Sequence, residues 1–485
     1  MRGLWRSRSG YEKALIIIFL LTLPFIRQQI QPDGQGYYAY LRSPLIDHNF
    51  QFASDWNDPP EKMLLLCGPC SDEVKQYWNH PARSILVVTL NHKAYANPIT
   101  RTGHLPNFYT VGPALLWAPF VIPTHVAVLV EDTLGAKIPA DGHSWPYVVA
   151  ICFATGIYGF LGLWFSFQLA KRHAVENWAF WATVGIWFAS SLPVYMYLDA
   201  TWSHAHSAFT VAVFLWYWDR TRGTRTAKQW FVLGLLSGLM VDVYLPNAIF
   251  ALAPVAEVVE TYLRTSTKFT GNVKPVKASL LFAAGGFLAF LPMLVSRQIV
   301  FGNPLILGIY AKVPWNWRNA AFLAVLFSKE HGLFVWTPIV LVAFLGLFAL
   351  WRRDRLLSRV GLLTSFLFYC LIAVYPWWDG TIAYGNRFFV SLTPIFVLGL
   401  ASGLSLATRL WGSSRAASWR FVPVTAMLIL WNFGLIFQWT THMVPTPGEV
   451  HWDEVLYNQF RVVPGQLLQD LGTEFSQIHE LQKPR

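Results

Sequence analysis

Apolar runs of roughly 20 residues recur from one end of this 485-residue chain to the other, and they constrain its fold more than any other feature. A helix needs about 20 apolar residues to cross the hydrocarbon core of a bilayer. Only 13% of the residues are charged, whereas soluble domains contain about 25%. The sequence therefore predicts an all-α polytopic integral membrane protein with about 11 to 13 transmembrane helices.

The apolar pattern also predicts where the spans lie. They are expected at about residues 11–26, 144–169, 178–198, 205–218, 229–244, 247–262, 278–300, 333–350, 362–376, 387–407 and 421–441. Residues 112–130 are apolar too, but they contain Pro113, Pro119 and Pro123. An odd number of crossings must join an outer Tyr109 to an inner Lys171, so we expect this segment to dip into the membrane and return, unless one end is misassigned.

The positive charge indicates orientation rather than a nucleic-acid partner. The net charge of +11 comes from Lys and Arg that cluster in short loops between spans, which is the positive-inside pattern. The first span has a basic flank and no cleavage site, so it predicts a retained signal anchor with a cytoplasmic N-terminus, in a bacterial inner membrane. We expect one transmembrane domain over residues 1–440, with an extracytoplasmic loop over about 27–109, and an extracytoplasmic tail over 441–485. Amphipathic pieces at 37–46 and 74–90 predict helices on the membrane surface.

Candidate site residues gather on the predicted outer face. Asp33 follows the first span directly and precedes an aromatic run that begins at Tyr37. A carboxylate at the membrane boundary can act as a base on a substrate whose tail stays in lipid. Arg387 lies between a Trp-rich turn and a long apolar run, which suits a guanidinium that holds a phosphate through paired donors. Weaker phosphate candidates are Arg101, Lys329 and His331.

Other polar residues leave alternatives open. Asp55 could bind a metal or sugar hydroxyls, or it could lie in a solvated loop. His204 and His206 are two residues apart at the start of a helix, so their rings cannot share one face, and at most one is expected at the site. Cys67 and Cys70 form a Cys-Gly-Pro-Cys run without a thioredoxin-like context, which favours a disulfide or free thiols over redox catalysis.

Four stretches of the chain resemble bacterial members of the GT-C superfamily of polytopic glycosyltransferases, which includes protein O-mannosyltransferases and lipid A aminoarabinose transferases. They are residues 33–42 (DGQGYYAYLR), 106–117 (PNFYTVGPALLW), 326–334 (LFSKEHGLF) and 384–389 (YGNRFF). The resemblance implies inverting transfer of a sugar from a polyprenyl-phosphate carrier at the extracytoplasmic face, with a first-loop carboxylate that Asp33 matches. Two departures concern the acceptor and a phosphate-binding lysine. Gly34 replaces the acidic second residue of the O-mannosyltransferases, and Leu105-Pro106-Asn107 replaces the Lys-Pro-Pro of the aminoarabinose transferases.

The predicted function is therefore transfer of a sugar from a polyprenyl-phosphate-linked donor to a hydroxyl or amine of a lipid, glycan or protein. The donor phosphate is already a good leaving group, so the protein must supply a base, Asp33, and cations for the phosphate. No cofactor and no nucleic acid are expected, and a divalent metal stays open. The alternative is a transporter or flippase of a lipid-linked or small solute, which internal repeats would favour; the two halves of the sequence show none.

Overall fold

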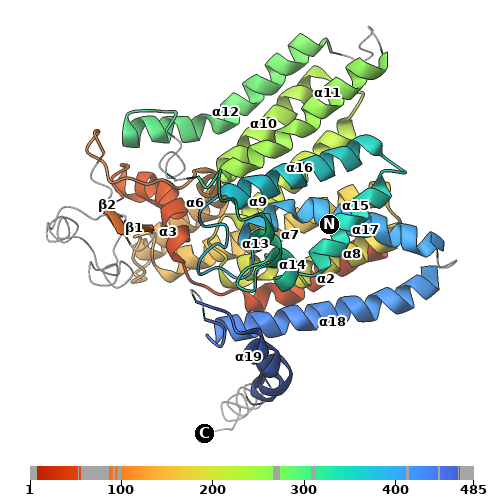
Figure 1. Ribbon diagram of the computed structural model, residues 1–485. Coiled ribbons are helices and arrows are strands. Elements are labelled where there is room, and N and C mark those ends of the chain that lie inside the picture. The colour runs from red at the N-terminus through yellow and green to blue at the C-terminus, as the bar shows by residue number, and fades with distance from the viewer. Residues whose placement is uncertain are drawn as a thin grey trace. The chain divides into compact units, whose positions relative to one another are not determined.

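The structure is a computed structural model, and it describes residues 8–52, 54–55, 87–90, 93–96, 100–265, 273–306, 313, 315–410, 414–445, 448–467 and 469. The described elements are helices apart from two short strands (Figure 1). The predicted helical fold class is confirmed at this level.

The chain divides into two compact units. The N-proximal unit comprises Ile17–Phe165 and Tyr195–Pro314, and the C-proximal unit comprises Met1–Ile16, Ser166–Val194 and Trp315–Arg485. The boundaries fall inside α2 (Gly10–Thr22) and α7 (Trp145–His173).

The N-proximal unit holds the first polar loop and most of the early helices. After α2 its elements are the turn η1 (Leu23–Phe25), α3 (Pro32–Arg42), η2 (Ser43–Asp47), β1 (Val87–Leu90), β2 (Lys93–Ala96), α6 (Gly112–Thr133), η3 (Val194–Leu198), α9 (His204–Thr221), α10 (Ala227–Val243), η4 (Leu245–Ala251), α11 (Leu252–Thr265) and α12 (Pro275–Phe301). The C-proximal unit contains α8 (Glu176–Phe188), α13 (Phe322–Phe327), α14 (Leu333–Trp336), α15 (Ile339–Leu350), α16 (Arg355–Val374), η6 (Arg387–Leu392), α17 (Thr393–Leu410), α18 (Ser414–Thr440), α19 (Trp452–Tyr457) and η7 (Asn458–Val462).

Six helical segments of the described chain are long and apolar enough to cross a membrane. They are Gly112–Thr133, Trp145–His173, Pro275–Phe301, Arg355–Val374, Arg387–Leu410 and Arg420–Thr440. The protein is thus an integral membrane protein. The larger number of spans and the orientation of the termini stay predictions.

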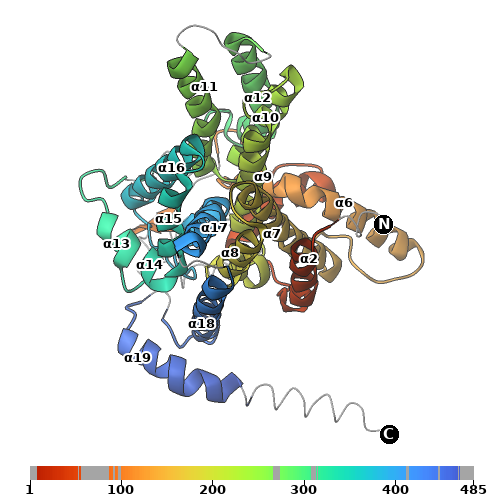
Figure 2. The same ribbon diagram turned by 90° about the vertical axis from the view of Figure 1, so that its right-hand side faces the viewer.

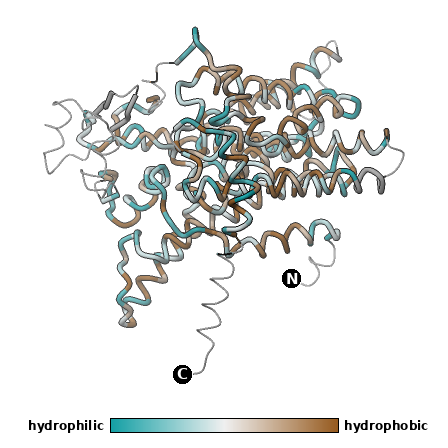
Figure 3. The backbone as a smooth tube through the Cα atoms, turned by 60° about the horizontal axis from the view of Figure 1, so that its bottom comes forward, coloured by the Kyte–Doolittle hydropathy of each residue, from teal (hydrophilic) through white to brown (hydrophobic). Residues whose placement is uncertain are grey.

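Glycines let helices within each unit approach closely. In the N-proximal unit, α10 lies beside α12 (Figure 2), and a Cβ on Gly285 would collide with the carbonyl of Phe231. In the C-proximal unit, a Cβ on Gly346 of α15 would collide with the carbonyl of Gly399 on α17. Helices in lipid associate through such small-residue contacts because burial of apolar surface gives little driving force there. Hydrophobic residues recur along the described helices (Figure 3).

The segment with three prolines is one continuous helix, α6, so the prolines do not break it, and the predicted dip into the membrane and back stays a prediction. Pro113 lies in its first turn, where no backbone donor is lost, and Pro119 and Pro123 are accommodated inside it. Hydrogen bonds connect the segments before and after α6 to the same helix, α3. Nδ2 of Asn107, before α6, donates to the Gly36 carbonyl at 2.8 Å. The Tyr38 hydroxyl, two residues further along α3, donates to the carbonyl of Gly142 at 2.9 Å, after α6.

The number of crossings between Tyr109 and Lys171 stays a prediction, and α6 is itself one of the six segments long and apolar enough to span a membrane.

Two helices were expected in the first loop, and the structure confirms the first but shows a strand in the described part of the second. The helix expected over residues 37–46 forms as α3 with η2. Of the helix expected over 74–90, residues 74–86 lie outside the described residues, and Val87–Leu90 form a strand that pairs antiparallel with β2. The β-branched run Val87-Val88-Thr89 favours a strand there.

The described part of the C-terminal tail packs against α18. Nε2 of Gln438 donates to Oε1 of Gln459 at 2.7 Å, and the rings of Trp431 and Trp452 stack at 6.2 Å. The division into a domain of residues 1–440 and a separate tail stays a prediction.

Candidate functional site

Asp33 occupies the first turn of α3, which follows α2, the turn η1 and a short link. Pro32 precedes it at a position where proline favours the start of a helix. The Asp33 side chain is partly exposed, and the hydroxyl of Tyr109 donates to its Oδ1 at 2.9 Å. The carboxylate is therefore oriented by a partner 76 residues away in sequence while part of it stays accessible.

Two glycines bring other segments against this turn. A Cβ on Gly36 would collide with the ring of Tyr109, and a Cβ on Gly34 would collide with the side chain of Thr201. The Thr201 hydroxyl also accepts from the backbone N–H of Gln31 at 2.9 Å. The Gly-Gln-Gly sequence is thus explained by two close approaches of neighbouring segments to one helix.

Tyr37 belongs to the same face of α3 as Asp33, four residues later. Its ring packs edge-on against Tyr109 with centroids 4.8 Å apart. Its hydroxyl accepts from the Ser203 hydroxyl at 3.0 Å. We call Asp33, Tyr37, Tyr109, Thr201 and Ser203 the α3 site.

A buried arginine fixes the segment that carries Tyr109. Arg297 of α12 is 1% exposed, and its guanidinium donates to the backbone carbonyls of Asn107, Phe108 and Tyr109 at 2.6, 2.8 and 2.9 Å. These three backbone carbonyls lie outside any helix, and one guanidinium donates hydrogen bonds to all of them, because its planar group presents several N–H donors. Arg297 therefore holds the Tyr109 backbone against α3 without approaching Asp33 itself.

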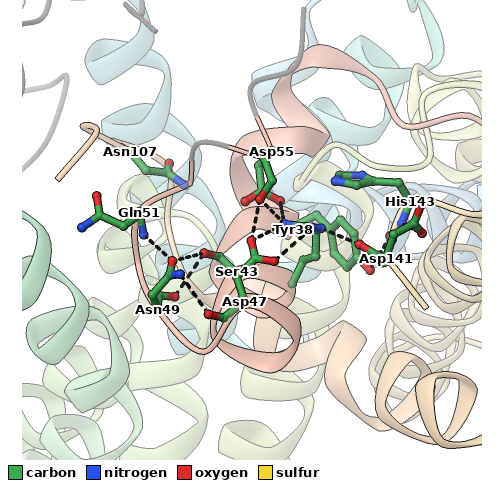
Figure 4. Close-up of polar contacts among 12 residues, drawn as sticks. Tyr38, Ser43, Asp47, Asn49, Gln51, Asp55, Asn107, Asp141 and His143 are labelled. Carbon is green, nitrogen blue, oxygen red and sulfur yellow. Dashed lines mark hydrogen bonds and ion pairs between the residues drawn. The ribbon is translucent and has the colours of Figure 1, made fainter. Parts of the chain in front are cut away.

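A second polar group lies at the C-terminal end of α3, where Arg42 pairs with two carboxylates and donates to one backbone carbonyl. Figure 4 shows Asp47, Asp55 and Asp141 of this group. Nη1 of Arg42 lies 2.8 Å from Oδ2 of Asp47 and 3.4 Å from Oδ1 of Asp55, and its Nε donates to the backbone carbonyl of Asp141 at 2.8 Å. Burial opposes ionisation of Asp47, but hydrogen bonds from Ser54 and Arg42 outweigh it and lower its pKa.

The pKa values of the two other carboxylates in this group are shifted in opposite directions. Burial raises the pKa of Asp55 to about 6, although the nearby Arg42 charge opposes that shift. Burial acts in the same direction on Asp141, but the backbone N–H groups of His143 and Ser144 donate to it at 2.8 Å and lower its pKa. Burial and the Arg42 charge lower the pKa of His143, so its ring is neutral at pH 7. Asp55 is thus a structured, buried residue and not part of a solvated loop.

Two other predicted site residues of this unit have structural contacts that account for them. His204 begins α9, and its buried ring packs edge-on against Tyr195 with centroids 4.8 Å apart. His206 lies in a separate aromatic neighbourhood against Trp117, as expected for rings two residues apart on a helix. Arg101 donates through Nε to the carbonyl of Phe301 at 3.1 Å and through Nη2 to Gly302, at the C-terminal end of α12. Its phosphate role stays a prediction.

The remaining candidates belong to the C-proximal unit. Arg387 begins η6, and its guanidinium lies 5.4 Å from the centroid of the Phe388 ring. His331 is buried, its Nδ1 lies 3.2 Å from the carbonyl of Gly385, and its ring stacks on Trp336. Burial lowers the pKa of His331, so it is a neutral ring and a poor partner for phosphate charge. Lys329 is exposed and pairs with Glu449.

Several residues of the α3 site and of the polar group around Arg42 were not among the predicted site residues. Tyr109 and Arg42 lie inside stretches that carry the family resemblance, so the motifs already contained them. Thr201 and Ser203 precede the two histidines that drew attention instead. Nothing local marks Arg297 as their support, because its partners are almost 190 residues away in sequence.

No family model matches the chain, and no curated protein matches it either. The GT-C resemblance is therefore a prediction from the four stretches alone.

Proposed function

We propose that this protein is an inverting glycosyltransferase that moves a sugar from a polyprenyl-phosphate carrier to an acceptor hydroxyl or amine at the extracytoplasmic membrane face. The observation that carries the proposal is the partly exposed Asp33 carboxylate, oriented by the Tyr109 hydroxyl at 2.9 Å and placed shortly after the first predicted span. An oriented carboxylate at this position suits a base that removes the proton of the attacking acceptor.

The chemistry divides between two groups of residues. Asp33 takes the acceptor proton as the acceptor oxygen or nitrogen attacks the anomeric carbon, and the carrier phosphate leaves from the opposite face, so that the configuration inverts. Arg387 is the cation assigned to the leaving phosphate, because a guanidinium offers paired donors to phosphate oxygens. Asp33 and Arg387 belong to different units, and a separate variant tests the role of each.

The test is sugar transfer by the purified protein in detergent micelles, with polyprenyl-phosphate sugars of several kinds as donors. Asp33→Asn should lower turnover by about 10² to 10⁴ while the protein stays folded. Arg387→Ala should abolish the thermal stabilisation by polyprenyl phosphate, which is about 2.7 kcal/mol at a hundred times the dissociation constant. The matched control is Asp132→Asn, an exposed carboxylate at the end of α6. Turnover of Asp33→Asn at the wild-type rate would remove Asp33 from the mechanism.

A further inference from the structure

The N-proximal unit contains a cavity of about 290 Å³ behind α3. It is lined by Gln28, Gln29, Ile30, Gln35, Tyr38, Asp55, His143 and Val148. Its size is close to the lower end of the range of small-molecule sites, about 300–1,000 Å³. Three carboxamides, one carboxylate and one imidazole converge on it, with the Tyr38 ring as an aromatic wall.

The cavity lies on the opposite face of α3 from Asp33. Residues advance by about 100° around a helix, so Gln35 is about 200° from Asp33, and Tyr38 and Arg42 continue the Gln35 face. The Asp33 face is occupied by Tyr37 and by the approach of Tyr109 to Gly36. The cavity is therefore separate from the α3 site.

The walls of the cavity are held by hydrogen bonds. The Tyr38 hydroxyl donates to the Gly142 carbonyl at 2.9 Å, and Arg42 ties α3 to Asp47, Asp55 and the Asp141 backbone. Four segments of the chain thus meet around a preformed space. A preformed cavity costs little ordering when a ligand enters.

One buried oxygen in this wall is left for a ligand. Asp55 is 3% exposed, and its Oδ1 pairs with Arg42. Its Oδ2 has no hydrogen-bond partner within the part of the chain that the structure describes, although Asp55 lines the cavity. A buried acceptor without a donor is unfavourable, so a hydroxyl or ammonium that donates to Oδ2 would be bound favourably.

The surrounding charge selects against anions. Among the described residues of this polar group, Asp47, Asp55 and Asp141 contribute three carboxylates and Arg42 one cation, and His143 is neutral at pH 7 because its pKa is lowered. The carboxamides of the glutamines on the cavity wall both donate and accept hydrogen bonds, and a hydroxyl group does the same. The ligand that fits is polar, rich in hydroxyls and without negative charge.

We propose that this cavity binds a sugar ring that carries no negative charge, through Oδ2 of Asp55 and the carboxamides of the glutamines on its wall. Binding of a sugar in this cavity does not require catalysis by Asp33, so this proposal is tested independently of the proposed transfer reaction. The sugar can come from a free monosaccharide or from a sugar unit of a glycan or glycolipid, and the two sources present the same hydroxyl chemistry.

The test measures direct binding to the purified full-length protein in detergent micelles by isothermal titration calorimetry. The probes are neutral hexoses and pentoses, hexosamines, short neutral oligosaccharides, and glucuronate and glucose 6-phosphate as anionic analogues. Asp55→Asn and Gln35→Ala are the cavity variants. Their matched controls are Asp132→Asn and Gln298→Ala, which change exposed side chains of the same kinds on α6 and α12.

We expect at least one uncharged or amine-bearing sugar to bind, and each cavity variant to weaken that binding at least tenfold. The controls and Asp33→Asn should bind as the wild type does, and the anionic analogues at least tenfold more weakly. Preference for oligosaccharides over monosaccharides would identify a glycan as the source, and equal affinity a free sugar. If Asp55→Asn does not fold, Gln35→Ala carries the test. The proposal is overturned if no sugar binds, if both cavity variants bind normally, or if the anionic analogues bind as well as the neutral sugars.

Discussion

Replacing Asp55 with asparagine should change the pH dependence of stability in one direction and by a predictable amount. Burial raises the pKa of Asp55 to about 6, whereas the usual value is 3.8. The folded protein therefore holds this proton more tightly than the unfolded chain does. The favourable contribution is complete below the unfolded pKa and is lost as the pH rises through the folded pKa. A difference of about 2 pKa units corresponds to about 3 kcal/mol.

The measurement is the free energy of unfolding in detergent micelles from about pH 4 to pH 7, for wild type and Asp55→Asn, followed by tryptophan fluorescence. Asparagine has nearly the same shape and does not titrate. The stability of wild type minus that of Asp55→Asn should fall by about 2 kcal/mol over this interval, because the contribution is not yet complete at pH 4. Asp132→Asn, at an exposed position, should show a constant difference from wild type.

Two neighbouring carboxylates act in the opposite direction. The lowered pKa values of Asp47 and Asp141 give stability that is lost as the pH falls, but both residues are present in both proteins, so the subtraction removes most of their effect. The stability of wild type minus that of Asp55→Asn could instead stay constant, or increase, as the pH rises. Either result would refute the conclusion that burial raises the pKa of Asp55 despite the Arg42 charge.

Three further substitutions test the packing. Gly36→Ala should displace the Tyr109 ring and so lower the free energy of unfolding by about 1–3 kcal/mol and remove most transfer activity. A Cβ on Gly10 meets no neighbour within 4 Å, so Gly10→Ala should leave stability and activity unchanged in the same assays. Arg297→Met should lower the free energy of unfolding by several kcal/mol, because three backbone carbonyls lose their donor at about 1–3 kcal/mol each. Thermal unfolding measures this loss, and a melting temperature equal to that of the wild type would contradict it. Gly285→Ala should lower the melting temperature because its Cβ would meet the Phe231 carbonyl, but the adjacent Gly286→Ala, with its nearest atom at 3.6 Å, should not; equal effects would disprove the α10–α12 contact.

The membrane helices were predictable because their signal is local. A run of apolar residues specifies a helix in lipid whatever its neighbours are, since every backbone group must be satisfied internally. The span expected at 144–169 accordingly forms α7, Trp145–His173. At α6 the prolines suggested a break, but the segment forms one continuous helix. What decides the path of α6 is the contact of its two flanks with α3, which no window of sequence contains.

The site was predictable only in part, for the same reason. The position of Asp33 after the first span could be identified from sequence, but Tyr109, Thr201 and Arg297 act on it from distant segments. Asp55 illustrates the converse. Its type and spacing fitted both a solvated loop and a ligand residue, and only the fold shows that it is buried against Arg42.

The two glycines of α3 link the α3 site to the cavity. Because Gly34 and Gly36 are the points where Thr201 and Tyr109 approach, rotating α3 would bring larger side chains such as Gln35 or Tyr37 into those contacts. The helix is therefore held in one rotational position, with Asp33 on one face and Gln35 and Tyr38 on the other. A helix with its side chains is about 10–12 Å across, more than one sugar ring can span. A sugar unit in the cavity is consequently not the one at Asp33, and a substrate that engages both places must extend around α3 with more than one sugar unit.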